Sequence, residues 1–147
     1  MEKISIKGIV VGAVIDWVTS LTFMMPLTAY VMVSRRIMQL PREQVKAALY
    51  AAMHKDLRIF GIQLLIGIAC SVIGSYVAGV LAKQAQILNG VLSAMLPSVT
   101  GIYSLFAGTY SQPLWLTLIL IFVATPLAGM LGGYLALLQA RRSAVPA

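Results

Sequence analysis

The segment from Gln63 to Lys83 is apolar and carries no charged side chain before Lys83. It is long enough to cross the hydrocarbon core of a bilayer as an α-helix. Small residues recur in it at every fourth position, as Gly67, Ser71, Ser75 and Gly79 on one stripe and Cys70, Gly74, Ala78 and Ala82 on the next. Because residues four apart share a helix face, another helix can approach these stripes closely. The pattern predicts a membrane helix that packs tightly against other helices.

The composition indicates an integral membrane protein. Of the 147 residues, 60% are hydrophobic and 10% are charged, whereas a soluble domain has about 25% charged residues. The net charge of +7 does not indicate nucleic acid as a partner, because the basic residues flank apolar segments, where lipid headgroups and topology account for them. The length predicts a single transmembrane domain.

Four apolar segments follow one another along the chain, at about residues 8–33, 59–82, 87–106 and 114–138. They predict an all-α, four-helix bundle that spans a membrane. The third segment is the least hydrophobic, since it contains Asn89, Pro97 and Gly101. Asp16, in the first segment, is the only charged residue inside any of the four.

The linker between the first two spans predicts one further helix, over about residues 41–55. Its apolar residues fall on one face and comprise Val45, Ala48, Leu49, Ala52 and Met53. Its basic residues lie off that face. This pattern is typical of an amphipathic helix on a membrane surface. We therefore expect the membrane-surface residues to be Arg42, Lys46, Leu49, Met53 and Lys55.

The second and fourth spans share an internal repeat. Gly74, Tyr76, Ala78 and Ala82 recur as Gly132, Tyr134, Ala136 and Ala140. The first and third spans match more faintly, with Asp16 aligned to Ser98. The repeat predicts two helical hairpins in parallel repetition about an axis along the membrane normal. The residues expected at helix–helix contacts are Gly67, Ser71, Gly74, Ser75, Ala78, Gly79, Ala128, Gly132 and Ala136.

The same motifs, GSYVAGVLAK, LNGVLSAML and LGGYLALLQARR, resemble those of a group of small, uncharacterised four-span prokaryotic membrane proteins. That group carries a Gly-Gly-Tyr-x-Ala type motif near a span end. The resemblance covers about half of the chain, from the second span onward, and the long basic linker departs from the group's pattern. It implies a four-span fold in a prokaryotic cytoplasmic (inner) membrane, and it implies no activity.

Charge does not decide the orientation in the membrane. Six lysine and arginine residues lie between the first two spans, and five lie on the opposite side. The positive-inside rule does not distinguish the two orientations at that margin. The resemblance favours a cytoplasmic location for both termini.

Asp16 is the main candidate for a functional residue, because ionisable side chains are costly inside a membrane. It could bind a proton or a cation in a cavity lined by Ser20, Ser71 or Ser98. Alternatively, it is protonated, or it bonds to Ser71, Thr19 or another polar group and has a structural role. The sequence contains no catalytic constellation, no motif with metal-ligand spacing and no cofactor-binding motif.

Two functions remain open. The favoured one is a non-enzymatic packing or accessory subunit that associates with itself or with a larger membrane complex, because the small-residue stripes exceed what one compact bundle needs. The alternative is a minimal oligomeric transporter or channel in which Asp16 is the proton- or cation-linked group. The expected partners are the lipid bilayer and other membrane subunits.

Overall fold

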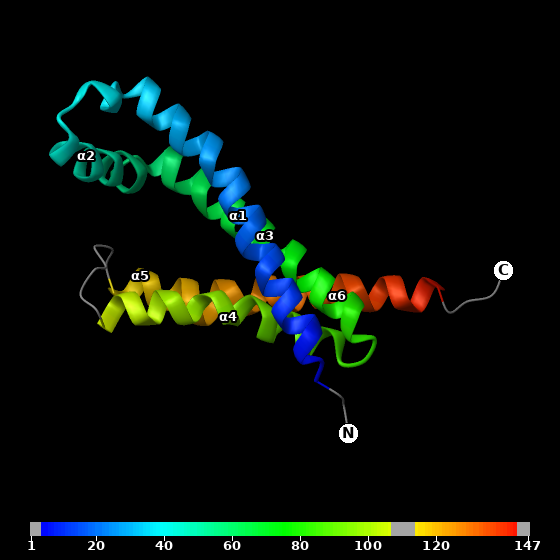
Figure 1. Ribbon diagram of the computed structural model, residues 1–147. Helices are drawn as coiled ribbons and strands as arrows, with labels where there is room; N and C mark the ends of the chain where they lie inside the picture. The colour runs from blue at the N-terminus through cyan, green and yellow to red at the C-terminus, as the bar shows by residue number, and fades with distance from the viewer. Residues whose placement is uncertain (1–3, 107–113, 144–147) are drawn as a thin grey trace. The chain divides into compact units, whose positions relative to one another are not determined.

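The computed structural model describes residues 4–106 and 114–143, and its fold is all-α (Figure 1). The elements are α1 (Ile6–Ser34), the short 3-10 helix η1 (Ile37–Gln39), α2 (Arg42–Lys55), α3 (Leu57–Ala82), α4 (Gln86–Phe106), α5 (Leu114–Ile119), the π-helical turn η2 (Leu120–Ala124) and α6 (Thr125–Ser143). The helices begin and end within a few residues of the predicted segments, except that the last one continues to Ser143.

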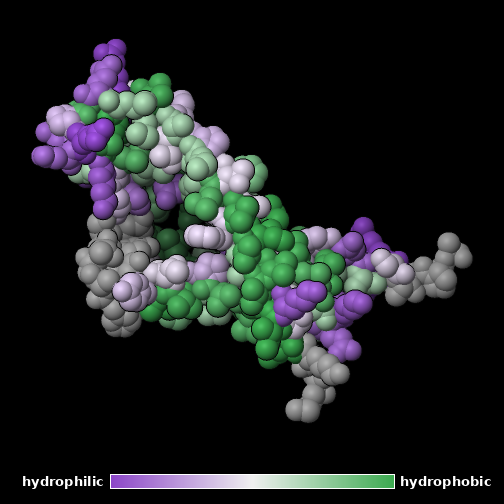
Figure 2. Space-filling model, viewed as in Figure 1, coloured by the Kyte–Doolittle hydropathy of each residue, from purple (hydrophilic) through white to green (hydrophobic). Residues whose placement is uncertain are grey.

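Three helical stretches within the described residues are long and apolar enough to cross a membrane. They are α1, α3 and the continuous run from Leu114 to Ser143. Many large apolar side chains on these helices are exposed, including Trp17, Leu65 and Phe122. Figure 2 shows hydrophobic residues over helix surfaces and hydrophilic residues gathered over η1 and α2 and near the described ends of the chain. This distribution suits contact with lipid.

The described residues form two compact units, where the length predicts one domain. The first unit contains α4, α5, η2 and α6, together with α1 up to Val18 and α3 from Ile68. The second unit is the segment Thr19–Gly67. The division therefore falls inside two long helices, α1 and α3, and each unit is described separately below.

In the second unit, the apolar face of α2 packs against the chain itself. Val45, Ala48, Leu49, Ala52 and Met53 surround a buried cluster of Val31, Ile37 and Ile59. These five residues are the face that the sequence predicts. Leu49 and Met53, predicted as membrane-surface residues, are half-buried and pack against the end of α1, η1 and the start of α3. Arg42, Lys46 and Lys55 are exposed.

Polar contacts fix the connection between α2 and α3. The Arg35 guanidinium forms an ion pair with the Asp56 carboxylate. The other oxygen of Asp56 accepts a hydrogen bond from the backbone N–H of Arg58 at 3.1 Å, which caps the start of α3. The His54 ring stacks on Tyr50 at a centroid distance of 4.0 Å. His54 therefore has a packing role on the surface of this unit.

In the first unit, α4 and α6 lie side by side and antiparallel (Figure 1). Gly90 meets Gly129 and Gly133, because a Cβ on Gly90 would lie 2.6 Å from the Gly129 carbonyl oxygen and 3.0 Å from the Gly133 Cα. Asn89, at the start of α4, is fully buried and accepts a hydrogen bond at 2.8 Å from the backbone N–H of Ser5. This bond joins the beginning of α1 to α4.

A π-helical turn interrupts the last apolar stretch just before Pro126. Proline has no N–H to donate, and its ring would clash with the carbonyl four residues earlier in a regular helix. The chain widens to a π-helix over Leu120–Ala124. The Leu120 carbonyl accepts the backbone N–H of Thr125 and, at 2.9 Å, the Thr125 hydroxyl as well. The predicted fourth span is thus three consecutive helical pieces.

Candidate functional site

Asp16 lies where α1 and α3 touch through their backbones. A Cβ on Gly74 would lie 2.5 Å from the Gly12 carbonyl oxygen and 2.8 Å from the Asp16 Cβ. Ordinary contacts between carbon atoms are about 3.5–4.0 Å, so only glycine fits there. The Asp16 side chain is 5% exposed. The carboxyl group is therefore enclosed by a helix contact that two glycines make possible.

The Ser71 hydroxyl, on α3, donates a hydrogen bond to Asp16 Oδ2 at 2.9 Å. Ser71 is one of the partners that the sequence suggests for Asp16. Ser98 lies half-buried on α4, and Ser20 belongs to the other unit. Of the three predicted serines, Ser71 is thus joined to the Asp16 carboxyl group, and the bond connects α1 to α3.

Other polar side chains are buried in the first unit. Ser75, Ser93 and Thr117 are each at most 1% exposed, and their hydroxyl oxygens find no hydrogen-bond partner among the side chains and backbone that the structure describes, residues 4–103 and 114–143. Ser93 of α4 lies against Gly12, whose missing side chain leaves room for its hydroxyl. Sequence reasoning missed Ser93 and Thr117, because an isolated hydroxyl residue in an apolar helix carries no spacing signal.

Most of the predicted contact residues lie between helices of the first unit. Gly74 and Ala78 of α3 face α1, where Ala78 contacts Gly8 and Gly12. Ser75 and Gly79, on the neighbouring stripe, face α6, where they meet Gly132 and Ala136. Ala128 is 5% exposed. The stripes of α3 are therefore covered by two other helices of the same chain.

Gly67 differs from this pattern. No described atom lies within 4 Å of the position that its Cβ would take, and the same holds for Gly61. Within its own unit, Thr19–Gly67, Gly67 therefore does not make the expected packing contact. One turn earlier on the same helix, the Gln63 side-chain oxygen is buried without a hydrogen-bond partner among the described residues.

Sequence reasoning also missed the residues that α6 uses against α4. A Cβ on Gly129 would lie 2.7 Å from the Val91 Cα, and one on Gly133 would lie 2.6 Å from the Ile87 Cα. The two glycines have the Gly-x-x-x-Gly spacing that brings helices together in membranes. That spacing is present in the sequence, but the prediction used the adjacent stripe of Ala128, Gly132 and Ala136 instead.

Comparison with known proteins identifies no relative: no family model, no curated protein and no solved structure matches the chain. Within residues 4–106 and 114–143, no three histidine, cysteine, aspartate or glutamate residues gather to form a metal site. The chemistry of the Asp16 site must therefore be judged from its geometry. A carboxyl group bonded to a hydroxyl and enclosed by glycine backbones can hold two helices together.

Proposed function

We propose that this protein is a non-enzymatic integral membrane protein that serves as a packing or accessory subunit, associated with copies of itself or with a larger membrane complex. The observation that carries the proposal is the open face of α3 at Gly67. Small residues and side-chain amides on exposed faces drive helix association in lipid. A helix of a partner subunit would cover Gly67.

The geometry of Asp16 supports a structural role over transport. Transport would require the carboxyl group to face a hydrated path. Instead, Asp16 is buried beside Gly12 and Gly74 and is bonded to Ser71. Only one part of the small-residue stripes supports association with a partner, whereas the sequence suggests that the stripes as a whole do. The packed stripes serve the fold of this chain, and the part of α3 around Gly67 remains for a partner.

The membrane arrangement belongs to the same proposal. The three long apolar helices and α4 would form four spans, with α1 paired to α3 and α4 paired to α6 as antiparallel hairpins. Contacts from α3 to α6 advance in the same direction along both helices, from Ser75–Gly132 to Gly79–Ala136, as parallel repetition of the hairpins requires. The resemblance to small four-span proteins supports a location in a prokaryotic cytoplasmic membrane.

A substitution at Gly67 tests the proposal. Gly67→Leu should leave the fold of one chain intact, because no described atom lies near its side-chain position. Ala69→Leu is the matched control, since Ala69 is exposed on α3, two residues away from the half-buried Gly67 and on another face. We expect Gly67→Leu, and not Ala69→Leu, to shift the complex to lower mass in native electrophoresis of mildly solubilised membranes.

A wild-type chain that migrates as a monomer would refute the proposal, as would equal behaviour of the two variants. Mass spectrometry of the wild-type complex then tells self-association from binding to another membrane protein. The number of different proteins in the band decides between these two cases.

Proton- or cation-linked transport remains the second candidate, and one observation favours it: a carboxyl group lies buried in an apolar helix beside a hydroxyl. Reconstituted wild-type protein and Asp16→Asn should be compared for ion-driven flux. Flux in the wild type that disappears in the variant, with assembly unchanged, would establish transport. The accessory-subunit proposal expects no flux from either protein.

A further inference from the structure

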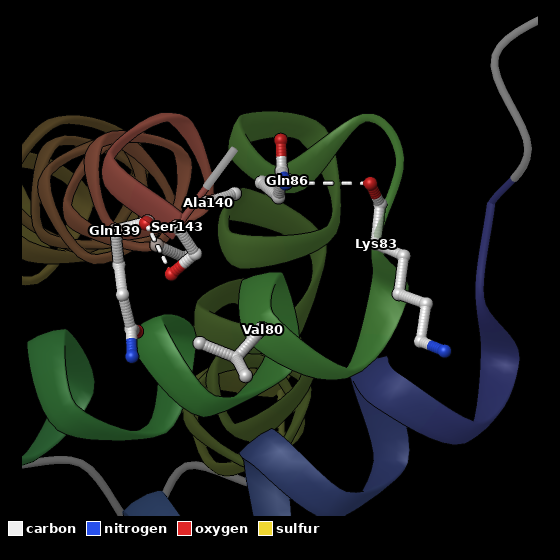
Figure 3. Close-up of a pocket in the computed structure, with 7 residues that line it drawn as sticks. Val80, Lys83, Gln86, Gln139, Ala140 and Ser143 are labelled. Carbon is white, nitrogen blue, oxygen red and sulfur yellow. Dashed lines mark hydrogen bonds between the residues drawn. The ribbon is translucent and has the colours of Figure 1, made fainter. Parts of the chain in front are cut away.

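A groove of about 250 Å³ lies where α3 ends, α4 begins and α6 ends (Figure 3). Its apolar wall consists of Val80, Ala136 and Ala140. Its polar rim consists of Lys83, Gln86, Gln139 and Ser143. All seven residues belong to the first unit. The groove therefore combines an apolar wall with a polar rim that includes a basic residue.

From this groove we infer a binding site for the headgroup of an anionic phospholipid. The inference rests on the proposed membrane function, because two of the long apolar helices, α3 and the run that ends with α6, stop at this groove. A groove at the end of membrane-spanning helices lies at the level of the lipid headgroups. Basic pockets between such helices are where anionic headgroups bind.

The charges of the groove suit a phosphate group. Lys83 is the basic residue among the lining residues, and none of them is acidic. The Lys83 side chain points away from Gln139 and Ser143 in Figure 3. Arg141 and Arg142 lie in the same last turn of α6 as Ser143, and they add positive charge close to the rim. The volume is below the usual range of about 300–1,000 Å³ for small-molecule pockets, which suits a headgroup whose acyl chains stay in the bilayer.

Hydrogen bonds hold the rim in place. The Gln86 side chain is 8% exposed and donates to the Lys83 carbonyl at 3.3 Å. The Ser143 hydroxyl donates to the Gln139 carbonyl at 3.2 Å. Tyr76 donates its hydroxyl hydrogen to the Gln139 side-chain oxygen, so the amide nitrogen of Gln139 remains as a donor for a phosphate oxygen.

The Lys83 side chain extends from the turn between α3 and α4 (Figure 3). Its backbone has φ = 57°, a left-handed conformation in which glycine is the usual residue at a helix end. A lysine there accepts backbone strain and provides a charged side chain on a flexible stem. The ammonium group can therefore move over the rim to meet a headgroup.

The test uses the full-length protein in vesicles that contain equal amounts of phosphatidylglycerol and phosphatidylcholine, with native mass spectrometry of the lipids that the protein retains. We expect phosphatidylglycerol to be retained over phosphatidylcholine by at least fivefold, about the factor that one basic residue near a membrane surface provides. Lys83→Gln should reduce this preference about fivefold. Lys46→Gln, which removes the same charge from an exposed residue outside the groove, should preserve it.

A second pair of variants distinguishes the effect of filling the groove from the effect of removing a charge. Ala140→Trp would fill the groove without altering charge, and Leu131→Trp adds the same side chain at an exposed residue of α6 outside it. The preference should be lost in the first variant and kept in the second. Equal losses from Lys83→Gln and Lys46→Gln, or a preference that survives Ala140→Trp, would overturn the site.

Two further measurements complete the design. Inorganic phosphate added to the vesicles should leave the retained lipid unchanged; displacement would mean that the groove binds free phosphate and would overturn the assignment to lipid. Alkaline extraction of the vesicles reports insertion independently. Protein that is extracted contradicts the proposed membrane function itself, whereas protein that stays inserted without lipid preference contradicts the lipid site alone.

Discussion

Replacing Gly74 with alanine should weaken the fold, whereas the same change at Gly61 should strengthen it. Both glycines lie inside α3, so each substitution gains about 0.8–1.0 kcal/mol of helix propensity, a value measured in water. At Gly61 the new methyl group meets no described atom within 4 Å. We therefore expect Gly61→Ala to stabilise the protein by up to about 1 kcal/mol.

At Gly74 the methyl group would lie 2.5 Å from the Gly12 carbonyl oxygen, about 1 Å short of an ordinary contact. The two backbones must separate to admit it, and overpacking of this kind costs about 1–3 kcal/mol. The separation also strains the Asp16–Ser71 hydrogen bond, which is worth about 0.6 kcal/mol in a membrane protein. The gain in helix propensity is common to both variants, so Gly74→Ala should be less stable than Gly61→Ala by about 1.5–3.5 kcal/mol.

The assay is reversible unfolding of the purified protein in mixed micelles with increasing dodecyl sulfate, followed by circular dichroism. Gly132→Ala provides a second position of the same kind, since its methyl group would lie 2.5 Å from the Val72 carbonyl oxygen. A Gly74→Ala variant that is as stable as Gly61→Ala would refute the close contact between α1 and α3 and the enclosure of Asp16 that follows from it.

Three further predictions address single contacts. Asp16→Asn should keep the fold, because asparagine still accepts a hydrogen bond from Ser71, whereas Asp16→Leu should lower the free energy of unfolding by about 1–3 kcal/mol, measured in the same micelles. Thr125→Val should cost about 1 kcal/mol, because it removes the hydroxyl that donates to the Leu120 carbonyl beside the Thr125 backbone N–H, and unchanged stability would contradict that bond. Lys83→Gly should raise the melting temperature in detergent, since the left-handed conformation costs a lysine about 1–2 kcal/mol that glycine avoids. The same variant should lose preference for the anionic lipid.

The helices themselves could be predicted from the sequence because hydropathy and length determine them. The segments predicted at residues 59–82 and 87–106 are observed as α3 (Leu57–Ala82) and α4 (Gln86–Phe106). The predicted apolar face of α2 consists of the residues that pack against the chain itself in the structure. A hydrophobic face has the same pattern whether lipid or protein covers it, so the sequence could not show that Leu49 and Met53 pack around Ile37.

The Asp16 site was predictable in part. A lone carboxyl group in an apolar helix needs a hydrogen-bond partner, and few polar residues were available to provide one. Ser71 was therefore a reasonable candidate. The contact of Ser93 with Gly12 was not predictable, because it depends on how α4 lies against α1, and a single serine does not encode a helix crossing.

The repeat shows how similar sequences can serve different contacts. Gly74 and Gly132 are equivalent in the repeat, yet Gly74 packs against α1 and Gly132 packs against α3. The hairpin partner of α6 is α4, and α6 meets it with Gly129 and Gly133. A helix has several faces, and repeated spacing of small residues specifies that a face is smooth without specifying which helix covers it.

The α3 helix therefore lies between two partners, α1 on the stripe of Gly74 and α6 on the stripe of Ser75. Any further partner must use a third part of α3, and the glycine with open space, Gly67, is where we expect it.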